Sequence, residues 1–148
     1  MELEVKLFTV NKRFPLTISR GTTAQTTNIW VKILQDGIEG WGEASPFGVG
    51  THSQSTDTIK SHLQQLAPIL EPFNPLQRQQ IEKILTQQQV PSSVRAALDM
   101  AMYDWLGKRV GLPVWQIWGL DRNVTVPTSV TIGINSPAGA RARARDWL

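Results

Sequence analysis

The sequence predicts an α+β fold in which a three-stranded antiparallel sheet is followed by helices and then by one strand-and-helix unit. Three observations predict it: apolar and polar residues alternate near the N-terminus, apolar residues recur at helical spacing from residue 59 to residue 106, and β-branched residues dominate from residue 124. The 148 residues, 41% of them hydrophobic, suffice for a compact core. Because the chain has no cysteine, disulfides and thiolate metal sites are excluded.

The first strand is expected where Leu3, Val5 and Leu7 alternate with charged residues. A second strand covers residues 28–35, and Asp36-Gly37 is a hairpin turn that leads into a third strand at residues 38–44. Residues 12–27 and 45–55 are expected as two long loops. Long loops on a firm scaffold often carry function, and surface loops without function are the alternative interpretation.

Three helices are expected next. Ser55 or Asp57 can cap the first helix, which Pro68 should kink or end. Asn74-Pro75 is interpreted as the cap and first turn of the second. The third runs from about residue 92 to residue 109 and should be central, because it is the most hydrophobic. Its apolar residues are Val94, Ala97, Leu98, Ala101, Met102, Trp105 and Leu106.

The character of the chain changes after a short turn at residues 113–118. Residues 124–134 are rich in β-branched side chains and are interpreted as a strand buried on both sides, as in a parallel sheet. Asn135-Ser136-Pro137 then provides a cap and a first-turn proline for a helix. Since one such unit leaves strand edges and an apolar face uncovered, we expect the chain to be interrupted at its C-terminal end.

Charge and hydropathy exclude several function classes. The net charge is +3, but the basic residues are scattered, and Arg141, Arg143 and Arg145 would spread around a helix rather than form one stripe. Nucleic-acid binding is therefore not expected. No apolar run has the length of a membrane span and the N-terminus does not read as a signal peptide, so a cytoplasmic protein is expected. His52 and His62 lack the neighbouring ligands that zinc needs.

Several motifs occur in an order that resembles the enolase superfamily. They are Gly40-Trp41-Gly42-Glu43-Ala44-Ser45-Pro46, the helical segment 93–107, and Gly111-Leu112-Pro113 followed by Trp118-Gly119. The muconate-lactonizing subgroup is most similar, because residues 128–137 and Ile18-Ser19-Arg20-Gly21 resemble segments of dipeptide epimerases that act on L-Ala-D/L-Glu. The resemblance implies a capping domain at residues 1–120 and the first βα unit of an incomplete TIM-like barrel at residues 121–148.

The resemblance also implies an activity. Enzymes of this kind remove and return the proton next to a carboxylate, using Mg²⁺ and lysine bases. The lysines and metal ligands lie on later barrel strands, so we expect no catalytic or metal-binding residue in this chain and no activity from these residues alone. Partners would be an acidic dipeptide and the rest of the barrel or another subunit, and the whole enzyme would be a homo-oligomeric isomerase.

Substrate recognition is what the chain is expected to contribute. By resemblance, Arg20 would grip the acidic end of the dipeptide, since a guanidinium binds a carboxylate through two parallel hydrogen bonds. Thr131 would contact the substrate from the barrel strand, and Gly48 and Thr51 would do so from the second specificity loop. Phe14 would line the pocket as well, with plain packing as the favoured alternative. An exposed loop arginine and a barrel-filling threonine are the alternatives.

The acidic residues and the function class have alternatives of their own. Glu43 is expected to brace a loop, and Asp99 and Asp104 to make buried structural hydrogen bonds. Alternative functions are o-succinylbenzoate synthase, N-succinylamino acid racemase or muconate cycloisomerase of the same superfamily, or a binding module without catalysis.

Overall fold

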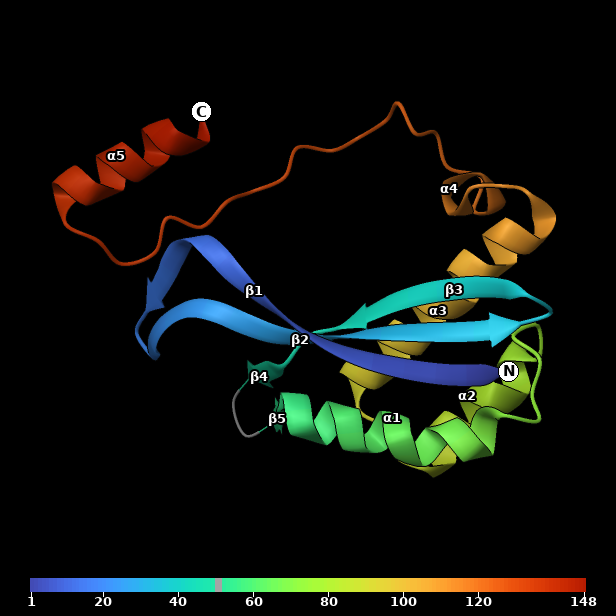
Figure 1. Cartoon of the computed structure of the whole chain (residues 1–148). Coiled ribbons are helices and arrows are strands. Elements are labelled where there is room, and N and C mark those ends of the chain that lie inside the picture. Colours follow the sequence, from blue (N-terminus) through green and yellow to red (C-terminus); the bar gives the residue numbers. More distant parts are fainter. Residues whose placement is uncertain (50–51) are drawn as a thin grey trace. The chain divides into compact units, whose positions relative to one another are not determined.

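The computed structural model describes residues 1–49 and 52–148 (Figure 1). Its elements in chain order are β1 (Glu2–Ile18), β2 (Gly21–Gln35), β3 (Ile38–Ala44), β4 (Phe47–Val49), β5 (His52–Gln54), α1 (Thr56–Leu70), α2 (Arg78–Gln87), α3 (Ser92–Val110), α4 (Val114–Ile117) and α5 (Pro137–Trp147). Across the described part of the chain, no helix is both long and apolar enough to cross a lipid bilayer.

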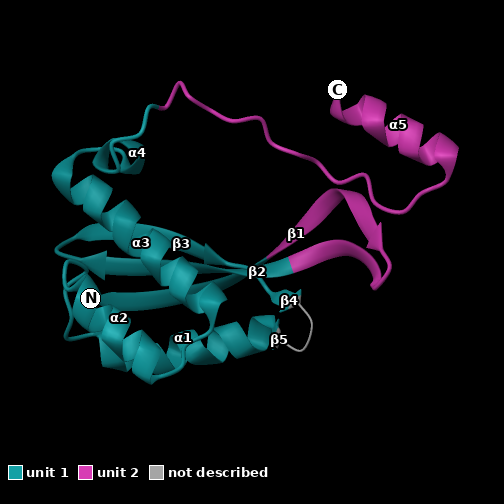
Figure 2. Ribbon diagram, turned by 180° about the vertical axis from the view of Figure 1, so that it is seen from behind, with its two compact units in different colours: residues 1–8, 27–121 teal, residues 9–26, 122–148 magenta. Residues whose placement is uncertain are grey.

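The chain divides into two compact units, which Figure 2 distinguishes by colour. Unit 1 contains residues 1–8 and 27–121, and unit 2 contains residues 9–26 and 122–148. β1 and β2 each have residues in both units. The two units therefore do not coincide with the predicted domains 1–120 and 121–148. That domain division stays a prediction.

The three-stranded sheet has the order β1-β2-β3, as the alternation predicted. The turn between β2 and β3 is Asp36-Gly37, with φ of 54° and 74°. Both angles are positive, as a two-residue hairpin with the favoured twist requires. The register pairs Gln35 with Ile38 and continues to Ile29 opposite Ala44, so the bounds predicted for the third strand are confirmed.

The prediction of a loop over residues 12–27 is wrong. β1 continues to Ile18 and β2 begins at Gly21, so this segment is the outer part of a long hairpin with Ser19 and Arg20 at its turn. Pairing continues after the hydrophobic alternation ends because each strand satisfies the backbone donors and acceptors of the other. Gly21 has a φ of 132°, which favours glycine at the start of the returning strand.

The prediction of a loop over residues 45–55 is wrong in part. β4 and β5 form a short antiparallel hairpin in which Phe47 pairs with Gln54. Residues 50 and 51, between the two strands, lie outside the described residues. The expectation that Thr51 contacts the substrate therefore falls outside the described residues.

The core of unit 1 lies between the sheet and the helices. Ile29, Val31 and Ile33 on the inner face of β2 are fully buried, together with the apolar stripe of α1 and the apolar face of α3. Trp105 is the largest buried side chain, and its indole N–H donates to the carbonyl of Gln35 at 3.0 Å. As predicted from its hydrophobicity, α3 is therefore the central helix.

Helix ends follow local chemistry. Ser55 caps α1 by accepting from the N–H of Thr58 at 3.1 Å, as predicted, and Pro68 lies inside the last turn of a helix that ends at Leu70. Gly111 ends α3 in the left-handed conformation, with φ 70°. These outcomes confirm the first and third helices.

The start predicted for the second helix is wrong, because α2 begins only at Arg78. Asn74 Oδ1 accepts from the N–H of Leu76 at 3.0 Å, and the N–H of Gln77 donates to the Asn74 carbonyl at 2.9 Å. The asparagine side chain thus closes a local turn, which competes with helix formation.

In unit 2, the strand predicted over residues 124–134 is not formed. Val124 and Val126 are 75% and 79% exposed instead of buried. A strand exists only through hydrogen bonds to a neighbour, and Pro127 has no N–H to donate. Ile134 does donate its N–H to the carbonyl of Thr17 at 2.7 Å, at the end of the segment.

The helix predicted after this segment is confirmed. α5 starts with Pro137 in its first turn, and the Ser136 hydroxyl accepts from the N–H of Gly139 at 3.1 Å. The ring of Phe14 packs against this helix: the Arg143 guanidinium lies 3.4 Å from its centroid and the Trp147 ring meets it edge-on at 5.5 Å. Phe14 therefore has a packing role in unit 2.

Candidate functional site

Arg20 stands at the turn of the β1–β2 hairpin in unit 2. Its side chain is exposed, and no described residue makes a hydrogen bond or ion pair with its guanidinium. Near the turn, the hydroxyls of Thr17 and Thr22 lie 2.9 Å apart and link the two strands. The structure therefore presents a free guanidinium on a supported hairpin.

Thr131 belongs to the same unit and is also exposed. The nearby hydrogen bond from Ile134 to the Thr17 carbonyl brings its segment to the end of β1, a short stretch of chain from Arg20. Gly133 makes this approach feasible, because it has a φ of 73° and a Cβ there would lie 3.0 Å from the Thr17 carbonyl oxygen. Both features favour glycine.

Gly48 lies in β4 and thus in unit 1, whereas Thr51 is outside the described residues. The base of the β4–β5 hairpin is attached to α3 by Gln54. Its Oε1 accepts from the N–H of Ser93 at 3.0 Å, and its Nε2 donates to the Ser92 hydroxyl at 3.0 Å. Sequence reasoning missed Gln54, since no local pattern signals a contact with residues this distant in the chain.

A hollow of about 450 Å³ adjoins the hairpin base. Its lining combines the end of β3, the segment that leads into β4 and the start of α3: Glu43, Ala44, Ser45, Pro46, Phe47, Ser92, Ser93 and Ala96. Glu43 accepts from Asn28 Nδ2 at 2.6 Å, and the Ser45 hydroxyl donates to Asn28 Oδ1 at 3.1 Å. Glu43 therefore braces the start of this segment, as expected.

The expectation that Asp99 and Asp104 are buried is wrong. Their side chains are 51% and 36% exposed, because neither belongs to the buried face of α3. Asp99 pairs with Arg78, and Asp104 accepts from Lys108 Nζ and from the Trp41 N–H, at 2.7 and 2.8 Å. Both make structural contacts, which agrees with the role expected for them.

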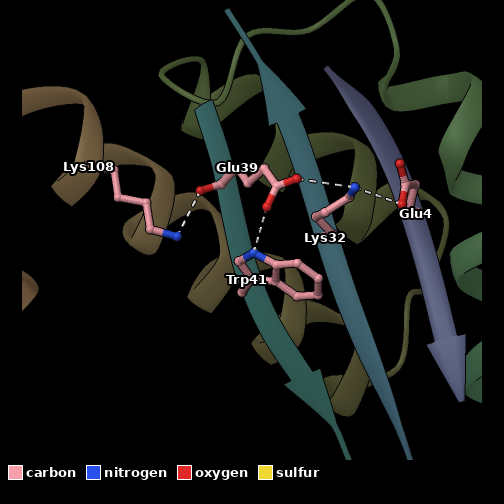
Figure 3. Close-up of polar contacts among 5 residues, drawn as sticks. All are labelled: Glu4, Lys32, Glu39, Trp41 and Lys108. Atoms are coloured by element: carbon pink, nitrogen blue, oxygen red, sulfur yellow. Dashed lines mark hydrogen bonds and ion pairs between the residues drawn. The ribbon is translucent and has the colours of Figure 1, made fainter. Parts of the chain in front are cut away.

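The outer face of the sheet carries a charge cluster and three aromatic rings. Lys32 lies between Glu4 at 2.9 Å and Glu39 at 3.4 Å, and Figure 3 shows Glu39 also accepting from the Trp41 indole. The hydrogen bond that Lys32 donates to Glu4, followed by the attraction of both carboxylates, raises the pKa of Lys32. Lys32 thus bridges two carboxylates on the outer strands of the sheet, which is a structural role.

The aromatic rings on this face form a continuous series. Phe8 lies 4.6 Å from Trp30, and Trp30 meets Trp41 edge-on at 6.0 Å, measured between ring centroids. The Phe8–Trp30 pair is tilted and the Trp30–Trp41 pair is edge-to-face, and aromatic pairs of this kind add stability beyond the burial of area.

A magnesium site would need several carboxylate or other oxygen ligands close together. Within residues 1–49 and 52–148, no group of three or more His, Cys, Asp or Glu side chains could hold a metal ion. Glu43, Asp99 and Asp104 instead engage separate neighbours. The described residues therefore do not fit a Mg²⁺ site.

Comparison with known proteins gives a consistent result. The family model for the N-terminal domain of mandelate racemase / muconate lactonizing enzyme matches residues 2–119. A hydrophobic dipeptide epimerase from a Flavobacteria bacterium is 37% identical over 136 residues, which cover 91% of this chain and 38% of that protein. The chain thus spans about two fifths of the length of this relative.

Two solved structures extend the comparison to the fold. A substrate-liganded L-Ala-D/L-Glu epimerase from Bacillus subtilis aligns with a TM-score of 0.79 and 30% identity, over 99% of this chain and 42% of that one. A dipeptide epimerase from Methylococcus capsulatus, complexed with Mg and the dipeptide L-Arg-D-Lys, aligns with a TM-score of 0.84 and 27% identity over the same shares. The predicted fold class, a three-stranded antiparallel sheet followed by helices, is confirmed.

Proposed function

Because the chain belongs to the mandelate racemase / muconate lactonizing enzyme family through its N-terminal domain, we propose that it is the substrate-covering part of a dipeptide epimerase. The named epimerases that it resembles support this function. In the proposed reaction, the α-proton of one residue of a dipeptide is removed and returned on the opposite face. In this proposal, the groups that transfer the proton, and a Mg²⁺ ion, belong to polypeptide outside these residues.

The observation that carries the proposed substrate class is the free guanidinium of Arg20. A guanidinium presents its donors in a planar fork that matches a carboxylate, and charge-assisted hydrogen bonds of this kind are among the strongest in proteins. At the turn of a hairpin, Arg20 can meet an incoming ligand without breaking an existing contact. We assign it to the side-chain carboxylate of an acidic dipeptide.

Thr131 supplements this role. Its hydroxyl is exposed in the segment whose end is hydrogen-bonded to Thr17, so it can donate to a backbone carbonyl or carboxylate of the substrate. Gly48, which has no side chain to obstruct a ligand, would contribute through the shape of the β4–β5 hairpin. The proposal further includes a cytoplasmic, homo-oligomeric enzyme.

The test compares acidic with neutral dipeptides in the full-length enzyme that carries this chain. Arg20→Gln is expected to lower kcat/KM for L-Ala-L-Glu by about 10- to 100-fold, because a hydrogen bond to a charged group contributes about 1.5–3 kcal/mol. The value for L-Ala-L-Leu should change less than about threefold. Exchange of the α-proton with solvent deuterium, followed by NMR, measures both rates.

Arg13→Gln is the matched control. It removes the same charge from the same unit, where Arg13 lies 4.9 Å from the Phe14 ring rather than at the hairpin turn. This variant should keep the ratio of the two rates. If Arg20→Gln left the ratio of the acidic to the neutral dipeptide rate unchanged, Arg20 would not select the substrate. If the enzyme turned over o-succinylbenzoate precursors or muconate but exchanged no dipeptide α-proton, it would catalyse another reaction of the family.

A further inference from the structure

We propose that Gln54 is a positioning residue, which fixes the β4–β5 hairpin on the first turn of α3 and so sets the place of the hairpin over the substrate. The substrate part of this inference rests on the proposed function. The anchoring part rests on contacts within unit 1 alone.

The amide of Gln54 uses both of its ends in this contact. Its oxygen accepts from the backbone N–H of Ser93 and its nitrogen donates to the hydroxyl of Ser92, each at 3.0 Å. These bonds join residues 39 and 38 positions apart in the chain. Because two bonds with different directions act on one planar group, they fix its orientation as well as its position.

The helix needs this contact as much as the hairpin does. The N-terminal N–H groups of a helix have no partner within it and are usually satisfied by a capping side chain. The residue before α3 is Pro91, which provides no side-chain cap. Gln54 takes over this function for the N–H of Ser93, so one side chain caps a helix and anchors a strand.

The described strands of the hairpin are short. Each of its strands has three residues, and an isolated hairpin of this size is marginally stable at best. Phe47 in β4 is 50% exposed, and the hollow of about 450 Å³ separates its base from close packing. Hydrogen bonds hold both chain ends of the described hairpin: those of Gln54 at the end of β5, and the Glu43–Asn28–Ser45 series before β4.

Three variants separate anchoring from simple folding. Gln54→Leu removes both bonds at nearly the same side-chain size. Gln54→Glu keeps an acceptor for the Ser93 N–H, allows the Ser92 hydroxyl to donate, and places a negative charge at a helix N-terminus, where it is favourable. Ser92→Ala removes one bond and keeps Gln54 itself.

Hydrogen–deuterium exchange of this 148-residue chain tests whether the Gln54 hydrogen bonds stabilise the hairpin and the start of α3. In Gln54→Leu, exchange in β5 and the first turn of α3 should be about five- to tenfold faster, as expected for losing about 1 kcal/mol of local stability. Ser92→Ala should give a smaller increase and Gln54→Glu less than about twofold. Unchanged exchange in both Gln54→Leu and Ser92→Ala would overturn the anchor, and Ser92→Ala decides alone if the leucine variant does not fold.

Steady-state kinetics of the full-length enzyme test whether Gln54 positions the hairpin for substrate binding. Gln54→Leu should raise KM for the preferred dipeptide at least about fivefold with kcat within about twofold, and Gln54→Glu should restore KM. Faster exchange with an unchanged KM would overturn the positioning role. An unsubstituted enzyme that exchanges no dipeptide α-proton would overturn the proposed function and this kinetic part together, while the exchange experiment would still decide the anchor.

Discussion

Gly42→Ala is expected to force α3 away from β3. A Cβ on Gly42 would lie 2.0 Å from the carbonyl oxygen of Ala97 and 3.1 Å from the backbone nitrogen of Ala101. Since real Cβ contacts are almost never shorter than 3.0 Å, the helix and strand must separate locally by about 1 Å. The obstacle is helix backbone, which cannot rotate aside as a side chain can. We therefore expect a loss of at least about 3 kcal/mol in the free energy of unfolding, the upper end for overpacked cores.

Urea denaturation of the 148-residue chain, followed by tryptophan fluorescence and far-UV circular dichroism, measures this loss. Gly48→Ala is the control, because the nearest atom to its Cβ would be the Ser53 hydroxyl at 3.9 Å, an ordinary contact. It should change the free energy of unfolding by less than about 0.5 kcal/mol. If Gly42→Ala were within about 1 kcal/mol of this control, the close approach of α3 to β3 would be refuted.

Two further predictions concern a helix cap and a charge cluster. Ser55→Ala removes the side-chain acceptor for the Thr58 N–H and should destabilise the chain by about 1 kcal/mol, whereas Ser55→Asp should retain most of the stability; an unchanged thermal midpoint in the alanine variant would contradict the cap. The raised pKa of Lys32, caused first by its hydrogen bond to Glu4, means that the folded state holds this proton more tightly. Its stabilising contribution is therefore complete below the unfolded pKa of about 10.4 and is lost as the pH rises through the folded pKa. Between about pH 9 and pH 11, the free energy of unfolding should fall less steeply with pH in Lys32→Met than in the parent. If it fell equally in both proteins, Lys32 would not be a source of the pH dependence.

The parts of the fold that the sequence predicts are those that neighbouring residues determine. Asp36-Gly37 has two positive φ angles, which favour a two-residue hairpin turn and so set the register of the two strands it joins. Ser55 and Ser136 cap their helices through bonds to residues three positions along. Asn74 shows the limit of such reasoning, because the same side chain can begin a helix or close a turn, and the turn is what forms.

In the candidate site, too, local features could be predicted from the sequence and long-range contacts could not. Arg20 stands out in the sequence only through a short motif, and the structure adds that its guanidinium is exposed. The place of this residue at a tight turn was not predictable, because strand pairing over residues 12–27 depends on two segments together rather than on either alone. The role of Gln54 could not be predicted for the same reason, since its partners Ser92 and Ser93 are distant in the chain.

Residues 124–134 show most clearly that propensity and pairing are separate contributions. β-branched side chains disfavour helix and favour an extended backbone, and the segment is indeed not helical. A strand additionally needs donors and acceptors on a neighbour at a spacing of about 4.8 Å. The Thr17 carbonyl meets this need for Ile134, and next to it Gly133 has a φ of 73°, which no extended strand adopts. The sequence thus specifies the local conformation, while the ladder that would bury Val124 and Val126 must be specified by whatever segment lies beside them.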